Sequence, residues 1–527
     1  MKKLLATLTC LLISLTCLIP NTIGAIADDN NQNKHEATMR AELFTPLSND
    51  FLSRTASVYK DVNGKDVTVY GFYREFSEQY NPNFSQALLI YQCIKYKEKY
   101  PEKPTSITVQ SFHFSVVFSA CVDHTKPNYG EVKNLYDKDY DEDGYYRLSY
   151  LLVEAAKKGV EVCVIGQLDA SPTLQLEGGV EKEIPDLSFV DYFNSHLTDD
   201  AYISGKKVSD FMTFGNCQWK CYGDKSAADM MHNKTCSVSN YIDNDGNEHG
   251  PAIWAGSINI DGIDYLGRNG LDTIQTAVIV AEHEQLRNTL YNYTKLMAGY
   301  CSQEDVVPFR VEMIKRNTEQ IKLIMEGKQN EIPESERVVY LGTEDDDIFE
   351  LYFTPFGGSF STWDTTYNPY CKYLSQMLEA SKGEDHLELV WNNVKFYETF
   401  DLGITMLEVI SKSFENNNNL DSLIRLVMLF LDASSFDNLV VGENIGYKNI
   451  NSPFYRYHSK DLQMSYVYDG ERRFISILNS LNMHEGSSYH QTNTALVIKE
   501  RERIGNNFYV EFATLSSPGL NILTHRI

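Results

Sequence analysis

The pattern of apolar and polar positions predicts that strands and helices alternate along the first half of the chain. Residues 106–114 alternate between apolar and polar side chains and are rich in β-forming residues, which predicts a strand. Apolar residues recur at helical spacing over residues 145–159, and two lysines and a glycine favour a helix C-terminus there. Residues 160–166 are mostly apolar and predict a buried strand. This order of elements is typical of an α/β fold.

The second half of the chain repeats this layout. Strands are predicted at residues 349–353, 386–391 and 423–431, and a helix at residues 401–414. Between the halves, residues 310–327 have helical character and are followed by a polar break, so this region is expected to connect the two halves. We therefore expect an α/β protein made of two similar halves, each a mixed β-sheet flanked by helices.

The N-terminus has the pattern of a secretory signal peptide. Residues 1–27 begin with Lys2 and Lys3, continue with an apolar run and end in the small-residue sequence Ala25-Ile26-Ala27. The alternative, an uncleaved membrane anchor, is disfavoured because the apolar run is shorter than the ~20 residues that a spanning helix needs. We therefore expect a secreted protein in which the polar residues 28–40 form a disordered lead-in.

Length and charge limit the domain organisation and the kinds of binding partner that we expect. A chain of 527 residues is long enough for two large domains, and the patterns above favour an N-terminal domain at 41–300, a connector at 301–343 and a C-terminal domain at 344–527. The 47 lysines and arginines face 72 aspartates and glutamates, which gives a formal net charge of -25. Because the average field repels polyanions, nucleic acid is an unfavourable partner.

Two distant stretches of the chain carry the same arrangement of polar residues. In each, a lysine follows a histidine by two residues, and a serine follows the lysine by five. The first copy consists of His232, Lys234 and Ser239, and the second consists of His458, Lys460 and Ser465.

A second and a third matching piece follow each copy in the same order. Gly256-Ser257-Ile258-Asn259 corresponds to Asn479-Ser480-Leu481-Asn482, and an apolar run that begins at Gln275 corresponds to one that begins at Asn493. Three matches in the same order indicate an internal duplication.

The repeated histidine and lysine suggest chemistry on a phosphate. Two residues at this spacing on a strand point to the same face. An imidazole can act as a nucleophile or carry a proton, and an ammonium group can hold a negatively charged oxygen. If the two halves pack about a pseudo-twofold axis, both pairs meet in one pocket, and such a pocket suits a phosphodiester.

These motifs resemble the duplicated His-x-Lys-x4-Asp and Gly-Ser-x-Asn signatures of the phospholipase D superfamily. The string from Gly256 to Asn259, followed by Asp264-Tyr265-Leu266, is particularly similar to secreted bacterial members. The resemblance extends from about residue 41 to the end and implies two pseudo-twofold related halves. It also implies a two-step phosphoryl transfer that requires no metal or other cofactor.

The resemblance implies a role for each motif residue. His232 is expected to attack phosphorus, and His458 to protonate the leaving alcohol and later deprotonate water, although the sequence alone does not separate these two roles. The groups expected to hold the non-bridging oxygens are Lys234, Lys460, Asn259 and Asn482. Phospholipid is the expected substrate, with transient contact to a membrane surface. The alternatives are a nuclease that acts on single strands and a non-catalytic binder of phosphorylated surface polymers.

Several positions depart from the family's pattern. Ser239 and Ser465 stand where the family has aspartate, and Asn479 replaces a glycine. The acidic residue that usually orients each histidine is replaced by Gln275 and Asn493, unless Asp272 takes this role in the first half. Ser257 and Ser480 are expected to support the site from behind.

Two interpretations of these departures compete. Either the enzyme uses uncharged partners for its histidines, which predicts slower turnover or a shifted pH optimum, or it has decayed into a binding protein. Random decay would not be expected to spare both histidines and both lysines, so an active enzyme is favoured.

Other candidates carry weaker signals. Residues 139–143 have the acidic spacing that opens a calcium loop, but the carboxylate expected at position twelve is absent, and an acidic helix start is the favoured alternative. Cys217 and Cys221 could ligate zinc, but no second pair follows them. The glycosylation sequon at Asn233 overlaps the expected site and is taken as a coincidence. His113 is expected to be a packed or surface histidine.

Overall fold

The computed structural model describes residues 55–526 apart from a set of interruptions. The interruptions are residues 62, 75–81, 135–142, 169–172, 178–179, 185–187, 198–201, 204, 218, 220–229, 261–271, 343–347, 360–361, 381–385, 392–454, 458–459, 461, 482–487 and 502–524. The predicted signal peptide and lead-in, and the helix and strand expected within 401–431, lie outside the described residues.

The first sheet holds nine strands of the described chain. They are β1 (Thr55–Lys60), β2 (Asp66–Arg74), β3 (Ser106–His113), β7 (Glu161–Leu168), β12 (Met212–Asn216), β13 (Lys234–Val238), β16 (Ala252–Gly256), β17 (Asp272–Ala281) and β21 (Tyr455–Tyr457). Their order is β1-β2-β17-β16-β13-β3-β7-β12, with β21 paired to β17. Strand β7 pairs in parallel with β3 and β12, whereas β13 is antiparallel to its neighbours, so the sheet is mixed as predicted.

The second sheet holds seven strands of the described chain. They are β18 (Tyr340–Leu341), β19 (Phe349–Phe353), β20 (His386–Trp391), β22 (Leu462–Tyr468), β23 (Glu471–Asn479), β24 (Thr494–Arg501) and β25 (His525–Arg526). Their order is β18-β19-β24-β23-β22-β20-β25, and every described pair is antiparallel. The strands predicted at 349–353 and 386–391 are confirmed.

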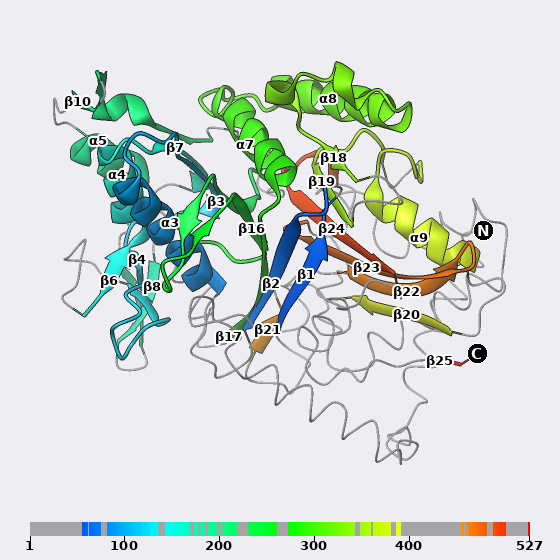
Figure 1. Ribbon diagram of the computed structural model, residues 1–527, viewed down its shortest axis with the longest axis horizontal. Helices are drawn as coiled ribbons and strands as arrows, with labels where there is room; N and C mark the ends of the chain where they lie inside the picture. The colour runs from blue at the N-terminus through cyan, green and yellow to red at the C-terminus, as the bar shows by residue number, and fades with distance from the viewer. Residues whose placement is uncertain are drawn as a thin grey trace, which may run out of the picture. The chain divides into compact units, whose positions relative to one another are not determined.

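Five neighbouring strands follow the same order and direction in the two sheets. The run β2-β17-β16-β13-β3 of the first sheet corresponds to β19-β24-β23-β22-β20 of the second, and all of these neighbours are antiparallel. Figure 1 shows β24, β23, β22 and β20 side by side in the second sheet. Strands β13 and β22 carry the ends of the two histidine–lysine motifs. This shared order agrees with the internal repeat inferred from the sequence.

Helices and short strands complete the described chain. The helices are α3 (Pro82–Lys99), α4 (Leu148–Lys157), α5 (Phe189–His196), α7 (Glu284–Ala298), α8 (Val307–Met325) and α9 (Pro369–Ala380), with 3-10 turns η2 (Val208–Phe211), η4 (Gln329–Glu331) and η5 (Glu334–Glu336). The short strands are β4 (Phe118–Cys121), β5 (Val132–Asn134), β6 (Tyr145–Arg147), β8 (Thr173–Glu177), β9 (Val180–Ile184), β10 (Tyr202–Ile203), β11 (Lys206–Lys207), β14 (Tyr241–Ile242) and β15 (Glu248–His249). None of the described helices is long and apolar enough to cross a bilayer.

Two predicted helices are present in the structure with different bounds. The helix expected at 145–159 starts only at Leu148, because Tyr145–Arg147 pairs with β4 instead, as suits its aromatic residues. Helix α8 confirms the helical character of 310–327. The described residues all belong to one compact unit. The boundaries at 300 and 344 therefore stay predictions.

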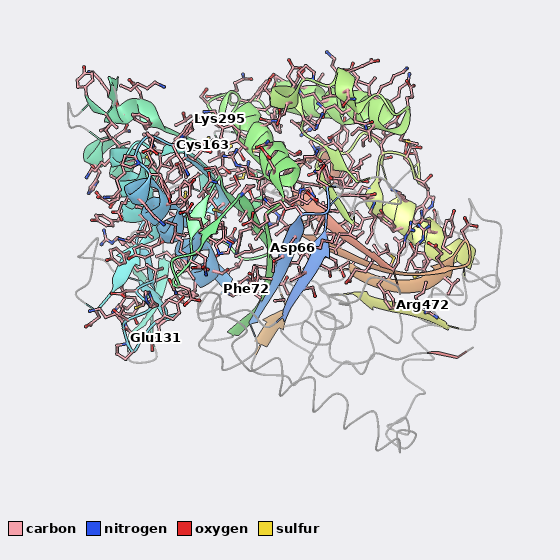
Figure 2. All side chains as sticks on the ribbon, in the orientation of Figure 1. Asp66, Phe72, Glu131, Cys163, Lys295 and Arg472 are labelled. Atoms are coloured by element: carbon pink, nitrogen blue, oxygen red, sulfur yellow. The ribbon has the colours of Figure 1, made fainter. Side chains whose placement is uncertain are left out.

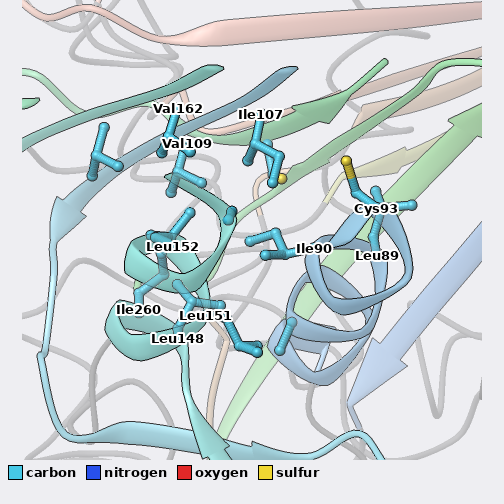
Figure 3. Close-up of a cluster of buried hydrophobic side chains, with 14 of the residues drawn as sticks. Leu89, Ile90, Cys93, Ile107, Val109, Leu148, Leu151, Leu152, Val162 and Ile260 are labelled. Atoms are coloured by element: carbon cyan, nitrogen blue, oxygen red, sulfur yellow. The ribbon is translucent and has the colours of Figure 1, made fainter. Parts of the chain in front are cut away.

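Apolar side chains fix the helices on the sheets and join the two halves. Leu89 and Ile90 of α3 and Leu152 of α4 pack towards Ile107 and other residues of β3 and β7 (Figure 3). Side chains fill the space between helices and sheets (Figure 2). A further cluster combines residues from both halves of the sequence, including Tyr59, Met231, Tyr293, Phe353 and Leu496. Each such side chain contributes ~1.5–3 kcal/mol when fully buried, so this shared core holds the ends of the two sheets together.

Candidate active site

His232 lies just before β13 and meets a residue from the other half of the chain. Its Nδ1 atom is 2.9 Å from Oδ1 of Asn493, which lies just before β24. His232 is 6% exposed and Asn493 is 0% exposed. The amide predicted to replace an orienting acid is therefore in contact with a motif histidine, and the contact joins residues that are 261 positions apart.

The surrounding hydrogen bonds fix which way the Asn493 amide points. Ser480 Oγ accepts from the Thr494 amide and donates to Asn493 Oδ1 at 3.1 Å. Thr354 Oγ1 donates to the Gln491 carbonyl at 2.6 Å, so it accepts from Asn493 Nδ2 at 3.4 Å. The Asn493 oxygen thus faces His232, and an amide oxygen can only accept. Nδ1 of His232 must carry a proton, which leaves Nε2 with the lone pair when the ring is neutral.

Backbone contacts hold the two segments in register. Met231 and Thr492 form a parallel bridge. The His232 amide donates to the Thr492 carbonyl at 2.9 Å, and the Thr492 amide donates to the Met230 carbonyl at 2.8 Å. β13 begins only at Lys234, so His232, whose amide pairs with the other half of the chain, lies just before the strand.

Lys234 lies beside the histidine under an aromatic ring. It is 1% exposed, and its Nζ donates to the His232 carbonyl at 3.0 Å. The same Nζ lies 5.9 Å from the centre of the Phe112 ring, whose centre is 5.6 Å from that of His232. Sequence reasoning missed Phe112, which carries no motif. His113 is half-buried with its ring 4.7 Å from Phe112, so it lies closer to the site than its isolated position in the sequence indicated.

The two downstream serines make matching hydrogen bonds. In the first half, Ser257 Oγ donates to Gln275 Oε1 at 2.7 Å and accepts from the Thr276 amide at 3.0 Å. In the second half, Ser480 Oγ makes the same two bonds to Asn493 and Thr494, at 3.1 and 3.2 Å. The repeat in the sequence is therefore also a repeat in hydrogen bonding, and both serines hold the amide that follows in the motif.

Gln275 lies beside the strand that leads to the second histidine. Strand β21 runs parallel to β17, with Ile274 opposite Tyr457. This mirrors the bridge between Met231 and Thr492. In each case the residue before a motif histidine pairs with the residue before an amide of the other half.

The second copy of the motif is described only in part. Lys460 is 2% exposed and lies two residues before β22. Ser465 lies within β22, where its backbone pairs with Glu388 and Phe474. His458 and Asn482 lie outside the described residues. Asn259 of the first copy is 4% exposed, and its carbonyl accepts from Asn83 Nδ2 at 2.6 Å.

Ser239 lies at the opposite end of β13 from the histidine. Ser239 lies five positions after Lys234, and at a rise of about 3.3 Å per residue the two residues are roughly 16 Å apart along the strand. Its Oγ accepts from the Ser106 amide at 3.0 Å, and its own amide donates to the Ser106 carbonyl at 3.0 Å. Ser239 therefore ties the end of β13 to the start of β3. In the first sheet, Asp272 is the first residue of β17, where its backbone pairs with Tyr455.

Three secondary candidates can be placed in the structure. Asn233 is 0% exposed, so its sequon is inaccessible in the folded chain. Cys217 is buried, as are the other described cysteines, while Cys221 lies outside the described residues. Of the acidic stretch 139–143, the structure describes only Asp143. Among the described residues, no three histidine, cysteine, aspartate or glutamate side chains gather as a metal site would require.

Comparisons with known proteins give matches only in structure. No family model matches the chain, and no curated protein matches it. Similar solved structures include phosphatidylserine synthase from Haemophilus influenzae, with 10% identity over 94% of this chain and 93% of that chain and a TM-score of 0.38. A variant of yeast tyrosyl-DNA phosphodiesterase has 9% identity over 83% and 90%, with a TM-score of 0.30.

A third similar structure is Nuc, a phospholipase D family member from Salmonella typhimurium. It has 13% identity over 44% of this chain and 92% of that chain, with a TM-score of 0.20. All three scores lie below 0.5, so these likenesses by themselves assign no activity to the chain.

Proposed function

We propose that the chain is a secreted, metal-independent phosphodiesterase of the phospholipase D type, with phospholipid as its substrate. The observation that carries this proposal is the contact between His232 Nδ1 and Asn493 Oδ1, which leaves Nε2 as the nucleophilic nitrogen. A histidine held in one tautomer by a buried partner is the arrangement that nucleophilic catalysis needs.

The proposed reaction has two steps. Nε2 of His232 forms a bond to phosphorus while the bond to the leaving alcohol breaks, and the alcohol oxygen takes a proton from His458. His458 then removes a proton from water, whose oxygen attacks phosphorus. The phosphorus–nitrogen bond breaks, and its electron pair returns to His232.

Cationic and amide groups are proposed to hold the phosphate oxygens. Lys234 and Lys460 are both buried, where an ammonium interacts more strongly with a phosphate than it would in water. Asn259 and Asn482 are proposed to add hydrogen bonds to the non-bridging oxygens. The lysines supply the positive charge that a metal would otherwise provide.

We further propose that Gln275 orients His458 as Asn493 orients His232. The parallel pairing of Ile274 with Tyr457 supports this, because the next residues along the two segments are Gln275 and His458. Reciprocal contacts of this kind are characteristic of a twofold arrangement. They support the pseudo-twofold relation that the sequence predicts.

The substrate class follows from charge. The net charge of -25 disfavours a nucleic acid, and a phospholipid presents a single phosphodiester at a surface. Turnover of phosphatidylcholine vesicles, cardiolipin vesicles, bis(4-nitrophenyl) phosphate and a labelled single-stranded oligonucleotide should be measured in EDTA. We expect cleavage of at least one lipid, and nucleotide release without lipid cleavage would replace phospholipid by single-stranded nucleic acid.

The matched variants are His232→Ala and His124→Ala, because His124 is an exposed histidine. His232→Ala should abolish turnover, and His124→Ala should leave it unchanged. The proposal fails if the unmodified protein cleaves none of the four substrates, or if His232→Ala retains full turnover.

A second candidate, a binder of phosphorylated surface polymers, is favoured by the amides Asn493 and Gln275 at both orienting positions. A neutral partner stabilises a positively charged phosphohistidine less than a carboxylate does. Detection of phosphohistidine at His232 by mass spectrometry after rapid mixing with substrate would exclude a pure binder. Saturable binding of a phosphorylated polymer without bond cleavage would favour it.

A further inference from the structure

Asn233 lies between the two motif residues His232 and Lys234, and its side chain points into the other half of the chain. It is 0% exposed. Its Nδ2 donates to Thr492 Oγ1 at 3.2 Å, and its Oδ1 accepts from Thr494 Oγ1 at 3.0 Å. Thr492 and Thr494 flank Asn493, the partner of His232.

Two three-residue runs are thereby interlocked. One run is residues 232–234 and the other is residues 492–494. The central residue of each contacts the other run, since Asn493 holds the His232 ring and Asn233 holds both threonines. A displacement of either run along the other would therefore break the Asn233 bonds and the histidine contact together.

A third contact anchors this arrangement to the first half. The second proton of Asn233 Nδ2 goes to Tyr293 Oη of α7 at 3.0 Å. The Tyr293 ring stacks on Phe353 at the end of β19, with ring centres 3.7 Å apart and planes at 7°. The three residues that bond to the Asn233 amide, Thr492, Thr494 and Tyr293, are all buried.

We infer that Asn233 is a positioning residue for the proposed reaction, one that sets the geometry of His232 against Asn493 through Thr492 and Thr494. This inference rests on the proposed function for its catalytic consequence, but not for its geometric one. The residue between the histidine and lysine is then a functional position, although the motif itself leaves it unspecified.

The test separates positioning from plain stability. Thr494→Val removes the hydroxyl that donates to Asn233 but keeps the shape of the side chain and the backbone bond to Ser480. Thr494→Ser restores the hydroxyl. Thr108→Val is the matched control, because Thr108 is a buried strand threonine whose hydroxyl bonds to Ser237 Oγ at 2.6 Å, towards the far end of β13.

Two readouts are needed. The first is the tautomer of His232 in protein labelled with ¹⁵N-histidine, read from ring ¹H–¹⁵N spectra without substrate and assigned with His232→Ala. The second is steady-state kinetics. Thr494→Val should broaden or shift the resonance of the His232 Nδ1–H group. It should also lower kcat about 10-fold with little change in KM, because a small misplacement of a reacting group slows the reaction strongly. Thr494→Ser should recover both properties.

The inference is overturned if Thr494→Val and Thr108→Val have the same His232 spectrum as the unmodified protein. It is also overturned if both variants lose turnover in the same proportion as they lose stability. If the unmodified protein cleaves no substrate, the proposed function fails, while the ring spectra still decide whether Asn233 positions His232.

Discussion

Asn493 and Gln275 occupy equivalent places in two sheets of the same strand order, yet their side chains differ by one methylene group. Each accepts a hydrogen bond from the serine that ends the neighbouring strand, Ser480 after β23 or Ser257 after β16. Asn493 is additionally held by Thr354, whose equivalent beside Gln275 is Arg74. The supporting serines are therefore constant, while the amide side chain that each serine holds and the residue opposite that amide on the adjacent strand differ.

This difference favours unequal roles for the two histidines. Two identical environments would give both rings the same proton affinity, whereas a nucleophile and a general acid need different ones. Asn493 fixes His232 with an unprotonated Nε2 when the ring is neutral, which suits attack on phosphorus. The longer Gln275 side chain belongs to the environment proposed for the proton carrier, His458.

The largest expected effect comes from removing the side-chain amide oxygen of Asn493 or of Gln275. Asn493→Leu keeps the side-chain volume but leaves His232 Nδ1 without its partner. We expect kcat to fall about 10²-fold with a smaller change in KM, as when other preorganised hydrogen bonds are removed. Steady-state kinetics on the best substrate of the panel would measure this.

Gln275→Leu is the matched variant for the other half. A loss similar to that of Asn493→Leu would support reciprocal orientation, and full activity would remove Gln275 from the proposal. Asn493→Asp sharpens the comparison further. A carboxylate beside the imidazole raises the pKa of His232, so the acidic limb of the kcat/KM profile should move to higher pH.

Much of this arrangement could be predicted from the sequence, but the crossing of the two halves could not. The alternation at 106–114 and the apolar run at 160–166 gave correct strands, because local patterns determine which face of an element is buried. The motif predicts that Asn493 stands where the resembled family has an acid. The spacing could not say that it serves His232, since contacts over 261 positions leave no local signal.

Two further residues, Phe112 and Ser239, lie at distances from the site that the sequence did not predict. Phe112 next to the histidine has no motif, and only the register that places Ser111 opposite Lys234 brings it to the site. The motif predicts that Ser239 supports the site. The strand rise carries it to the far end of β13, where it pairs with Ser106. A place in the motif is therefore neither necessary nor sufficient for a residue to lie near His232.

The next largest effect is on stability and distinguishes the two sheets. Glu350 of β19 is 2% exposed and lies 3.1 Å from Lys372 Nζ and 3.2 Å from Lys499 Nζ. The equivalent place in β2 is Tyr70, which is uncharged. Glu350→Gln leaves two lysines without their shared carboxylate, so we expect a loss of about 3 kcal/mol in the free energy of unfolding. Urea unfolding would measure it.

The pH dependence and a control follow from the same carboxylate. Burial by itself would raise the pKa of Glu350, but the charges of Lys372 and Lys499 and the hydrogen bonds from Tyr352 and Tyr373 together outweigh burial and bring it to about 2. Its contribution to stability is therefore present above the unfolded value of 4.5 and is lost as the pH falls towards 2.

Glu471→Gln, at an exposed pair with Arg501, should cost less than about 1 kcal/mol. Equal losses for both variants would contradict the buried ion pair.

A smaller effect tests whether the serines are equivalent. Ser257→Ala and Ser480→Ala each remove one hydroxyl that donates to an amide oxygen and accepts from a strand amide. We expect each to lower the free energy of unfolding by about 1–2 kcal/mol, and by similar amounts. Thermal unfolding of the two variants would show this, and a large difference between them would mean that the matching hydrogen bonds are not energetically matched.

The smallest effect concerns the two-stranded hairpin inserted between β13 and β16 of the first sheet, which has no counterpart between β22 and β23 of the second. Strands β22 and β23 are joined by the tight turn at Asp469 and Gly470, both with positive φ, whereas the hairpin β14–β15 separates β13 from β16. His249 holds this hairpin, with Nε2 2.9 Å from Asp243 Oδ2 and Nδ1 3.4 Å from Glu282 Oε1. Because a carboxylate faces each ring nitrogen, the folded state favours the imidazolium.

His249→Gln should therefore destabilise the protein in a pH-dependent way. The hydrogen bond to Glu282, together with Asp243, raises the pKa of His249 above 6.5, so its contribution is complete below 6.5 and is lost as the pH rises through the raised value. Burial by itself would raise the pKa of Glu282, but His249 and Lys65 help to hold it at about 2, so the carboxylate contribution is complete above 4.5. The variant should lose about 1 kcal/mol between these limits and less at about pH 9. Thermal unfolding at both pH values measures this, with His124→Gln as the exposed control, and an equal loss at both would mean that His249 acts by packing on Tyr241 instead.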